Sequence, residues 1–389
     1  MNLSGDKKMK IPFNKVYYAG KELSYIEDTM KRGCISGDGY YTQLVTSFLQ
    51  KKFMVDRVLM TTSATHALEM AAILIDIRPG DEVIMPSFTF PSTANAIMLR
   101  GGVPVFAEIQ ENTLNIDPID IKNKITNRTK AILPVHYGGV SCDMDKIMDI
   151  ATKNNLFVIE DAAQAVNSKY KNKFLGTIGH IGCYSFHGTK NYVSGEGGAI
   201  TINSNNTDLI KRAEIIRQKG TNRNEFLRGK VDKYSWVDVG SSYVPSDILM
   251  AILYAQVQNL DEIKAKRKII NDYYNKSITK YIESGVIKKN TYIPNNCESN
   301  YHLFYLIFGS EKVRDSVIYK LREREIYATT HFMPLHSSKK GIELGYHIED
   351  LPITEKISKC LLRLPMYTEM SVEEMNYVII ALIQILEEI

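Results

Sequence analysis

The stretch Ser185-Phe-His-Gly-Thr-Lys190-Asn-Tyr-Val-Ser-Gly195-Glu-Gly-Gly198 places a single lysine between a short strand end and a glycine-rich turn. A lysine amine is a nucleophile only when it is deprotonated, and a site that desolvates it or bonds it to a cofactor aldehyde achieves this. The glycines at 195, 197 and 198 allow a tight turn and close approach to a bound molecule. Lys190 is therefore the first candidate catalytic residue, and a solvated loop lysine is the alternative.

An acidic site precedes this stretch. Leu156-Phe-Val-Ile159 is typical of a buried parallel strand, and it ends in Glu160-Asp161-Ala-Ala-Gln164. Open α/β sheets bind ligands at the carboxyl ends of their strands. A carboxylate there keeps a pyridine nitrogen protonated, and pyridoxal phosphate chemistry requires such an Asp together with a lysine bonded to the aldehyde. A helix cap or a loop charge is the alternative for Asp161.

Two further stretches have the chemistry of anion sites. Thr61-Thr-Ser-Ala-Thr65 leads into a helical pattern over residues 66–75, and free N–H groups at a helix start bind phosphate. Ile35-Ser-Gly-Asp-Gly39 is a polar turn whose glycines expose N–H groups. Capping alone and a plain connection are the respective alternatives.

The alternation of predicted strands and helices between residues 80 and 160 indicates the fold class. Short apolar runs at 83–85, 103–106, 131–133 and 156–159 alternate with helical patterns at 92–99 and 143–153. Strands that alternate with helices form a parallel sheet with right-handed crossovers. No Gly-x-Gly-x-x-Gly follows these strands and no Gly-x-x-x-x-Gly-Lys occurs, so the usual dinucleotide and nucleoside triphosphate turns are missing.

The pattern changes beyond residue 246. A long helix is expected over 246–274, then a strand over 303–308 and helices over 313–323, 352–362 and 371–387. A chain of 389 residues exceeds what one core usually organises. We therefore expect a large domain over 1–250 and a smaller α/β domain over 251–389.

Composition excludes several classes of protein. A net charge of +4 over this length indicates no nucleic-acid partner, and neither a signal-peptide core nor an apolar run of membrane-spanning length occurs. The five cysteines are scattered without a Cys-x-x-Cys pair. We expect a cytoplasmic protein without a membrane segment. His331 and His336 suggest a metal pair, but they lack a nearby carboxylate pattern, so no metal is expected.

These motifs together carry a resemblance that spans essentially the whole chain. With Pro86-Ser-Phe-Thr-Phe-Pro-Ser-Thr93, the Asp161 and Lys190 stretches resemble the sugar-nucleotide aminotransferase family of the aspartate aminotransferase superfamily. The resemblance implies an α/β fold of type I for pyridoxal phosphate enzymes. Residues 80–90, 174–182 and 219–223 most resemble members that act on dTDP-4-keto-6-deoxy-D-glucose.

The resemblance also implies roles for individual residues. Lys190 bonds the cofactor aldehyde, Asp161 pairs with the pyridine nitrogen, Gln164 lies near the phenolic oxygen and Phe90 stacks on the ring. The remaining implied contacts are with the cofactor phosphate, by Ala64, Thr65 and Ser185, and with the substrate, by Ser36, Gly37 and His331.

One departure from the family bears on assembly. Most members carry Gly-x-Asn-x-Arg, whose Asn reaches the phosphate in the neighbouring subunit, whereas this chain has Gly240-Ser-Ser242-Tyr-Val244. Ser242 then replaces that Asn, as it does in members acting on the dTDP sugar. The implied assembly is a homodimer with shared sites, to which residues 219–223 also contribute.

The implied reaction transfers the amino group of glutamate to C4 of dTDP-4-keto-6-deoxy-D-glucose. Its product is a dTDP-4-amino-4,6-dideoxyhexose, gluco or galacto, for surface polysaccharide synthesis; the turn after Lys190 is one residue shorter than in the similar members, which leaves the configuration open. Two alternatives are a pyridoxal phosphate-dependent sugar dehydratase, which carries His in place of the lysine, and a non-catalytic sugar-nucleotide binding protein.

Overall fold

The computed structural model describes residues 9–203 and 206–389, so most of the polar N-terminal stretch searched for a leader lies outside the described residues. Its centre is a seven-stranded sheet of order β1-β9-β8-β5-β4-β2-β3. Only β9 runs antiparallel to its neighbours among these strands, which confirms the predicted mostly parallel sheet. The strands are β1 (Arg57–Thr61), β2 (Glu82–Pro86), β3 (Val103–Ala107), β4 (Thr129–Ile132), β5 (Phe157–Asp161), β8 (Ile181–Ser185) and β9 (Gly198–Ile202).

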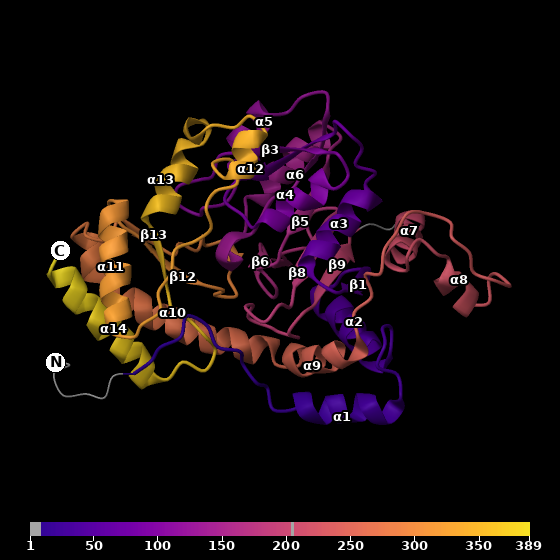
Figure 1. Cartoon of the computed structure of the whole chain (residues 1–389), viewed down its shortest axis with the longest axis horizontal. Helices are drawn as coiled ribbons and strands as arrows, with labels where there is room; N and C mark the ends of the chain where they lie inside the picture. Colours follow the sequence, from indigo (N-terminus) through magenta and orange to yellow (C-terminus); the bar gives the residue numbers. More distant parts are fainter. Residues whose placement is uncertain (1–8, 204–205) are drawn as a thin grey trace.

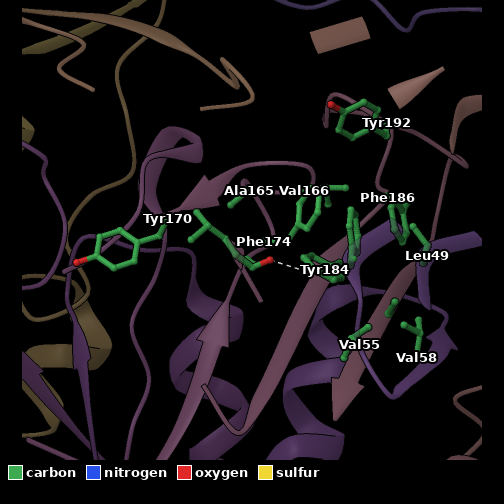
Figure 2. Close-up of a cluster of buried hydrophobic side chains, with 14 of the residues drawn as sticks. Leu49, Val55, Val58, Ala165, Val166, Tyr170, Phe174, Tyr184, Phe186 and Tyr192 are labelled. Atoms are coloured by element: carbon green, nitrogen blue, oxygen red, sulfur yellow. Dashed lines mark hydrogen bonds between the residues drawn. The ribbon is translucent and has the colours of Figure 1, made fainter. Parts of the chain in front are cut away.

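Helices cover both faces of this sheet because its strands are apolar on both sides. Neighbouring residues of β5 enter different cores: Val158 packs in the cluster formed with α2, α6 and α9, and Ile159 packs in the cluster formed with α3, α4 and α7. Figure 2 shows part of the first cluster, with Tyr184, Phe186 and Tyr192. The helices around the sheet are α1 (Glu22–Arg32), α2 (Tyr40–Phe53), α3 (Ala64–Leu74), α4 (Pro91–Met98), α5 (Pro118–Asn123), α6 (Met144–Lys153), α7 (Thr207–Arg217), α8 (Arg223–Leu227) and α9 (Asp247–Val257), with a 3-10 turn η1 (Tyr137–Gly139).

A second core lies at the opposite end of the molecule from α7 and α8 (Figure 1). It is built on an antiparallel sheet of order β10-β12-β13, and Ile11 joins it through a bridge to Ile326. Its elements are α10 (Leu260–Glu283), β10 (Lys289–Asn290), β12 (Phe304–Ile307), α11 (Glu311–Glu323), β13 (Leu361–Leu364) and α14 (Val372–Glu387). Between α11 and β13 the chain forms α12 (Lys339–Glu343), η2 (Ile348–Asp350) and α13 (Pro352–Cys360), and this segment packs against the large sheet through Leu335 and Leu351. A small third sheet contains β6 (Lys169–Tyr170), β7 (Lys173–Phe174) and β11 (Cys297–Glu298).

Two sequence predictions of elements are corrected. The single helix expected over 246–274 is two helices, because Asn259 leaves the helical conformation and its side-chain amide donates to Ala255 O at 2.8 Å. The helix expected over 352–362 ends at Cys360, and the chain continues as β13, which pairs with β12. The division at residue 250 stays a prediction; α9, which spans this residue, packs in the core of the large sheet.

A buried acid beside the site holds the sheet edge together. The Glu160 carboxylate accepts hydrogen bonds from the backbone N–H groups of Gly176 at 2.8 Å, of Ile178 at 2.7 Å, and of Gly179. It also accepts from Nε2 of His136 at 2.9 Å, while Nδ1 of His136 accepts from the N–H of Cys142. Glu160 thus fixes the turn before β8, and its side chain points away from the cavity that Asp161 lines.

We expect Glu160→Gln to lower the free energy of unfolding by about 3 kcal/mol, since an amide NH₂ would face backbone donors and leave them unpaired. Urea unfolding of the variant measures the loss. The exposed Glu262, whose one ion-pair partner within the described part of the chain is Lys266, provides the control Glu262→Gln, for which a change under about 0.5 kcal/mol is expected. Equal stabilities for the two variants would contradict the structural role of Glu160.

Candidate active site

Lys190 lies on a short loop that two buried aromatic residues anchor. Phe186 and Tyr192 are both buried in the first core cluster (Figure 2). The Tyr192 hydroxyl donates to Leu260 O at 3.2 Å. The loop between them is closed by a hydrogen bond from the Lys190 N–H to His187 O at 2.9 Å. The half-buried Lys190 side chain therefore leaves the core surface at a fixed position.

The glycines after Lys190 serve backbone packing. Gly195 has φ +89°, which confirms the tight turn. A Cβ on Gly198 would lie 2.3 Å from the carbonyl carbon of Ser63 and 2.5 Å from the nitrogen of Ala64. The close approach at Gly198 is therefore to the start of α3, and it brings β9 against the predicted phosphate site.

Asp161 ends β5 and is almost completely buried. Its carboxylate accepts from the Thr93 hydroxyl at 2.9 Å and from the N–H of Ala163 at 3.1 Å. Burial raises the pKa of Asp161, and these two hydrogen bonds and the charge of Lys190 only partly offset the effect. The protein's own groups therefore do not fully stabilise the ionised Asp161 carboxylate, and a cation bound beside it would do so.

Burial shifts the pKa of the Lys190 amine in the opposite direction from that of Asp161. Desolvation is the main cause that lowers the pKa of Lys190 to about 8. The negative charge of Asp161 raises this pKa, and the positive charge of Arg363 lowers it further. With this pKa about a tenth of the amine is unprotonated at pH 7, compared with well under a thousandth for an ordinary lysine, and the unprotonated amine is the form that acts as nucleophile and general base.

The start of α3 fits a phosphate. Ser63 caps the helix by accepting from the N–H of His66, whereas the N–H groups of Ala64 and Thr65 have no acceptor among the described residues. The Thr65 hydroxyl lies 2.7 Å from that of Ser92. Free N–H groups at a helix start, with the positive end of the helix dipole, bind anions.

One cavity of about 380 Å³ brings these groups together. All the cofactor residues predicted from the sequence except Ser242 line it: Ala64, Thr65, Phe90, Asp161, Gln164, Ser185 and Lys190. Gln164 is fixed there because its side-chain oxygen accepts from the N–H of Gly138 at 2.8 Å. The roles within this set stay predictions, but their convergence follows from the fold.

Ser36, Gly37 and Ser242 do not line this cavity within one chain. Ser242 forms a bridge with Gln218, and a Cβ on Gly37 would meet Val244 Cγ1 at 2.0 Å, so the two segments lie side by side. Within one chain these three residues therefore lie outside the Lys190 cavity, and their roles in the site stay predictions.

The two histidines considered for a metal have separate environments. His331 is buried against Tyr137 and Phe332, and neither of its ring nitrogens has a hydrogen-bond partner among the described residues. His336 Nδ1 lies 2.7 Å from the Ser87 hydroxyl, which gives it a structural partner. No group of three or more possible metal ligands occurs within residues 9–203 and 206–389.

Several residues of the site carried no assigned role in the sequence. Thr93, which orients Asp161, stands in the quoted run from Pro86 and could have been found by its hydroxyl. Arg363 lies on β13, a strand that the sequence did not predict. Its guanidinium donates to Thr330 O at 3.0 Å and stacks over the Phe13 ring. Arg363 has no carboxylate partner among the described residues. The cavity wall also includes Ser63, Leu68, Thr89, Ser92, Val135, Ala163, His187, Thr189, Glu196 and Phe332.

Comparison with known proteins agrees with this geometry. Residues 17–383 match the model of the DegT/DnrJ/EryC1/StrS aminotransferase family. The chain belongs to this family. It is 31% identical over 377 residues to GDP-perosamine synthase of Escherichia coli O157:H7, covering 95% of this chain and 96% of that one. It is 33% identical over 380 residues to the spore coat polysaccharide biosynthesis protein SpsC of Bacillus subtilis, covering 95% of each.

Solved structures give the same assignment. The PLP form of the putative sugar aminotransferase Spr1654 from Streptococcus pneumoniae is 25% identical, covers 98% of this chain and 99% of that one, and superposes with a TM-score of 0.90. Its PMP form superposes with a TM-score of 0.91. The predicted family, fold and cofactor are thereby confirmed: the protein is a pyridoxal phosphate-dependent sugar aminotransferase. The described helices include none that is long and apolar enough to cross a membrane.

The donor set fits the cofactor. Asp161 would hold the pyridine nitrogen, Lys190 would bond the aldehyde, and the start of α3 with Ser185 would hold the phosphate. The hydrogen bonds of Asp161 only partly offset its burial, so a protonated pyridine ring would stabilise its charge. The free N–H groups of Ala64 and Thr65 would donate to the anionic phosphate.

We expect the labelling rate of Lys190 in the cofactor-free protein to rise with pH and to level off above about 8, as the amine loses its proton. Reductive methylation with formaldehyde, followed by peptide mass spectrometry, measures it. Arg363→Met should shift the midpoint upward, because the guanidinium lowers the Lys190 pKa. A midpoint near 10 in the wild type would contradict desolvation of this amine.

We expect Asp161→Asn to stabilise the cofactor-free protein at pH 8 and to slow transamination at least about 100-fold. The raised folded-state pKa means that the ionised carboxylate costs stability above that pKa, and that the cost disappears as pH falls toward the ordinary value of 3.8. The rate falls because a buried charge pair with the ring is lost. Thermal unfolding at pH 8 and pH 5, with single-turnover kinetics, tests both effects; a stable variant of normal rate would remove Asp161 from the site.

Proposed function

We propose that the protein transfers the amino group of glutamate to C4 of dTDP-4-keto-6-deoxy-D-glucose, giving a dTDP-4-amino-4,6-dideoxyhexose for surface polysaccharide synthesis. The observation that carries this function is the low-pKa Lys190 amine in one cavity with the buried Asp161 and the start of α3. The choice of dTDP rests on the sequence stretches 80–90, 174–182 and 219–223. One relative is named for a GDP sugar, so the nucleotide is what the experiment must decide.

The residues of the chain divide the chemistry between them. When bound, pyridoxal phosphate supplies an electron sink for the pair left by the breaking C–H bond. The Asp161 carboxylate holds a proton on the ring nitrogen, and the Lys190 amine takes a proton from the donor carbon and returns one to the sugar carbon. Arg363, without a carboxylate partner among the described residues, supplies positive charge for an acidic amino donor. The neutral His331 ring, whose pKa burial keeps well below its usual value, offers one donor and one acceptor to the sugar.

Incubation with glutamate and dTDP-4-keto-6-deoxy-D-glucose should yield an amino sugar whose ring proton couplings give the C4 configuration by NMR. Lys190→Ala should yield none, because no other lysine among the described residues lines the cavity. Amination of a GDP-linked keto sugar alone would contradict the proposed nucleotide. Failure with every keto sugar nucleotide would contradict the function.

We further propose a homodimer with shared sites, acting in the cytoplasm, where all five free thiols stay reduced. Residues 219–239 fold back through a Thr221–Trp236 bridge and carry apolar side chains into solvent, with Trp236 79% exposed and Leu227 63% exposed. Together with the remote position of Ser242, this supports an arm that completes a second subunit's site.

Mixing inactive Lys190→Ala chains with chains carrying Ser242→Ala and Arg223→Ala should restore partial activity, because each mixed dimer then has one intact site. Activity is measured after subunit exchange has been confirmed by native mass spectrometry. No recovery in confirmed mixed dimers would show that each site is built from one chain.

A further inference from the structure

A second cavity of about 380 Å³ adjoins the Lys190 cavity, between α4 and α12. Phe90 and Phe332 line both cavities, and their rings meet edge to face with centroids 5.4 Å apart. This ring pair is the wall between the two spaces. A substrate that reacts at Lys190 and extends past the pair therefore enters the second cavity.

The lining of the second cavity suits a planar, weakly polar group. Its walls are mainly apolar, from Pro91, Ala94, Met98, Phe106, Met333, Leu335 and Leu344. The polar side chains are those of Asn95, Ser338 and Lys340, and no acidic residue belongs to the described lining. Lys340 is already paired with Glu343 at 3.1 Å, whereas the exposed Asn95 amide has no partner among the described residues.

These groups distinguish between nucleobases. The Watson–Crick edge of guanine presents adjacent N–H donors, which a carboxylate accepts best. Thymine presents a carbonyl oxygen beside one N–H, which a single amide matches with one donor and one acceptor, and its methyl group needs apolar contact. An apolar wall with one free amide and no carboxylate therefore favours thymine.

We propose that this second cavity binds the thymine base of the sugar nucleotide, with the Asn95 amide on the imide edge and Met98 against the ring. The proposal rests on the proposed function, and it places nucleotide selection between α4 and α12. It also accounts for the exposure of Phe90, 54%, at a position between the two cavities.

The test measures binding of dTDP and GDP, without sugar, to the holoenzyme by titration calorimetry. The wild type should bind dTDP at least about 10-fold more tightly than GDP. Met98→Trp fills the cavity and should weaken dTDP at least about 10-fold, whereas Leu99→Trp, on the exposed side of the same helix turn, should not. Asn95→Asp should shift the preference toward GDP, because the carboxylate accepts from guanine and cannot donate to thymine.

A second measurement needs no variant. 4-Thiothymidine diphosphate, irradiated on the wild type, should crosslink to peptides that contain residues 94–98 or 338–344. Crosslinks elsewhere, equal binding of the two diphosphates, or equal effects of the two tryptophan variants would overturn the proposal. So would dissociation of a dimer by Met98→Trp alone, which would make a second copy the occupant.

The base site and the proposed function can fail independently, and these experiments distinguish the two failures. If the enzyme aminates the dTDP sugar and Met98→Trp leaves its KM unchanged, the cavity assignment fails and the function stands. If dTDP binds and crosslinks as expected but no dTDP-keto sugar is aminated, the function fails and the base site stands.

Discussion

The site depends on a buried carboxylate and a half-buried amine that line one cavity. Asp161 gains too little from its own hydrogen bonds to offset its burial, and desolvation lowers the pKa of Lys190 to about 8. The protein holds both because β5 and β8 pair in parallel, with Asp161 opposite Cys183. Each residue then leaves its strand at the carboxyl edge of the sheet, where a ligand meets both.

The surrounding structure serves to keep that arrangement fixed. Glu160 points to the other side of β5 and ties down the turn before β8, while Phe186 and Tyr192 anchor the lysine loop in the core. Gly198 lets β9 reach the start of α3, so the predicted phosphate site and the lysine loop are parts of one packed unit. The chemistry therefore depends on backbone packing as much as on the reacting side chains.

Much of this could be predicted from the sequence, because the alternation of apolar runs and helical patterns is local information. Lys190, Asp161 and the start of α3 each carry a local signature, and strand order brings them together. The break at Asn259 could not be predicted, because it comes from a side chain that competes with the helix. The sequence did not predict β13, because Leu361 to Leu364 continues a helical pattern and becomes a strand only by pairing with β12. The importance of Arg363 is likewise tertiary, since the lack of an acidic partner is visible only in the fold.

We infer that the buried Asp161 carboxylate keeps the ring nitrogen of the bound cofactor protonated. Loading the enzyme with cofactor labelled with ¹⁵N in the ring and recording its NMR spectrum tests this directly. We expect the chemical shift of a protonated pyridine nitrogen that persists at pH 8, and the shift of a neutral nitrogen in Asp161→Asn. A neutral nitrogen in the wild type at pH 8 would contradict it.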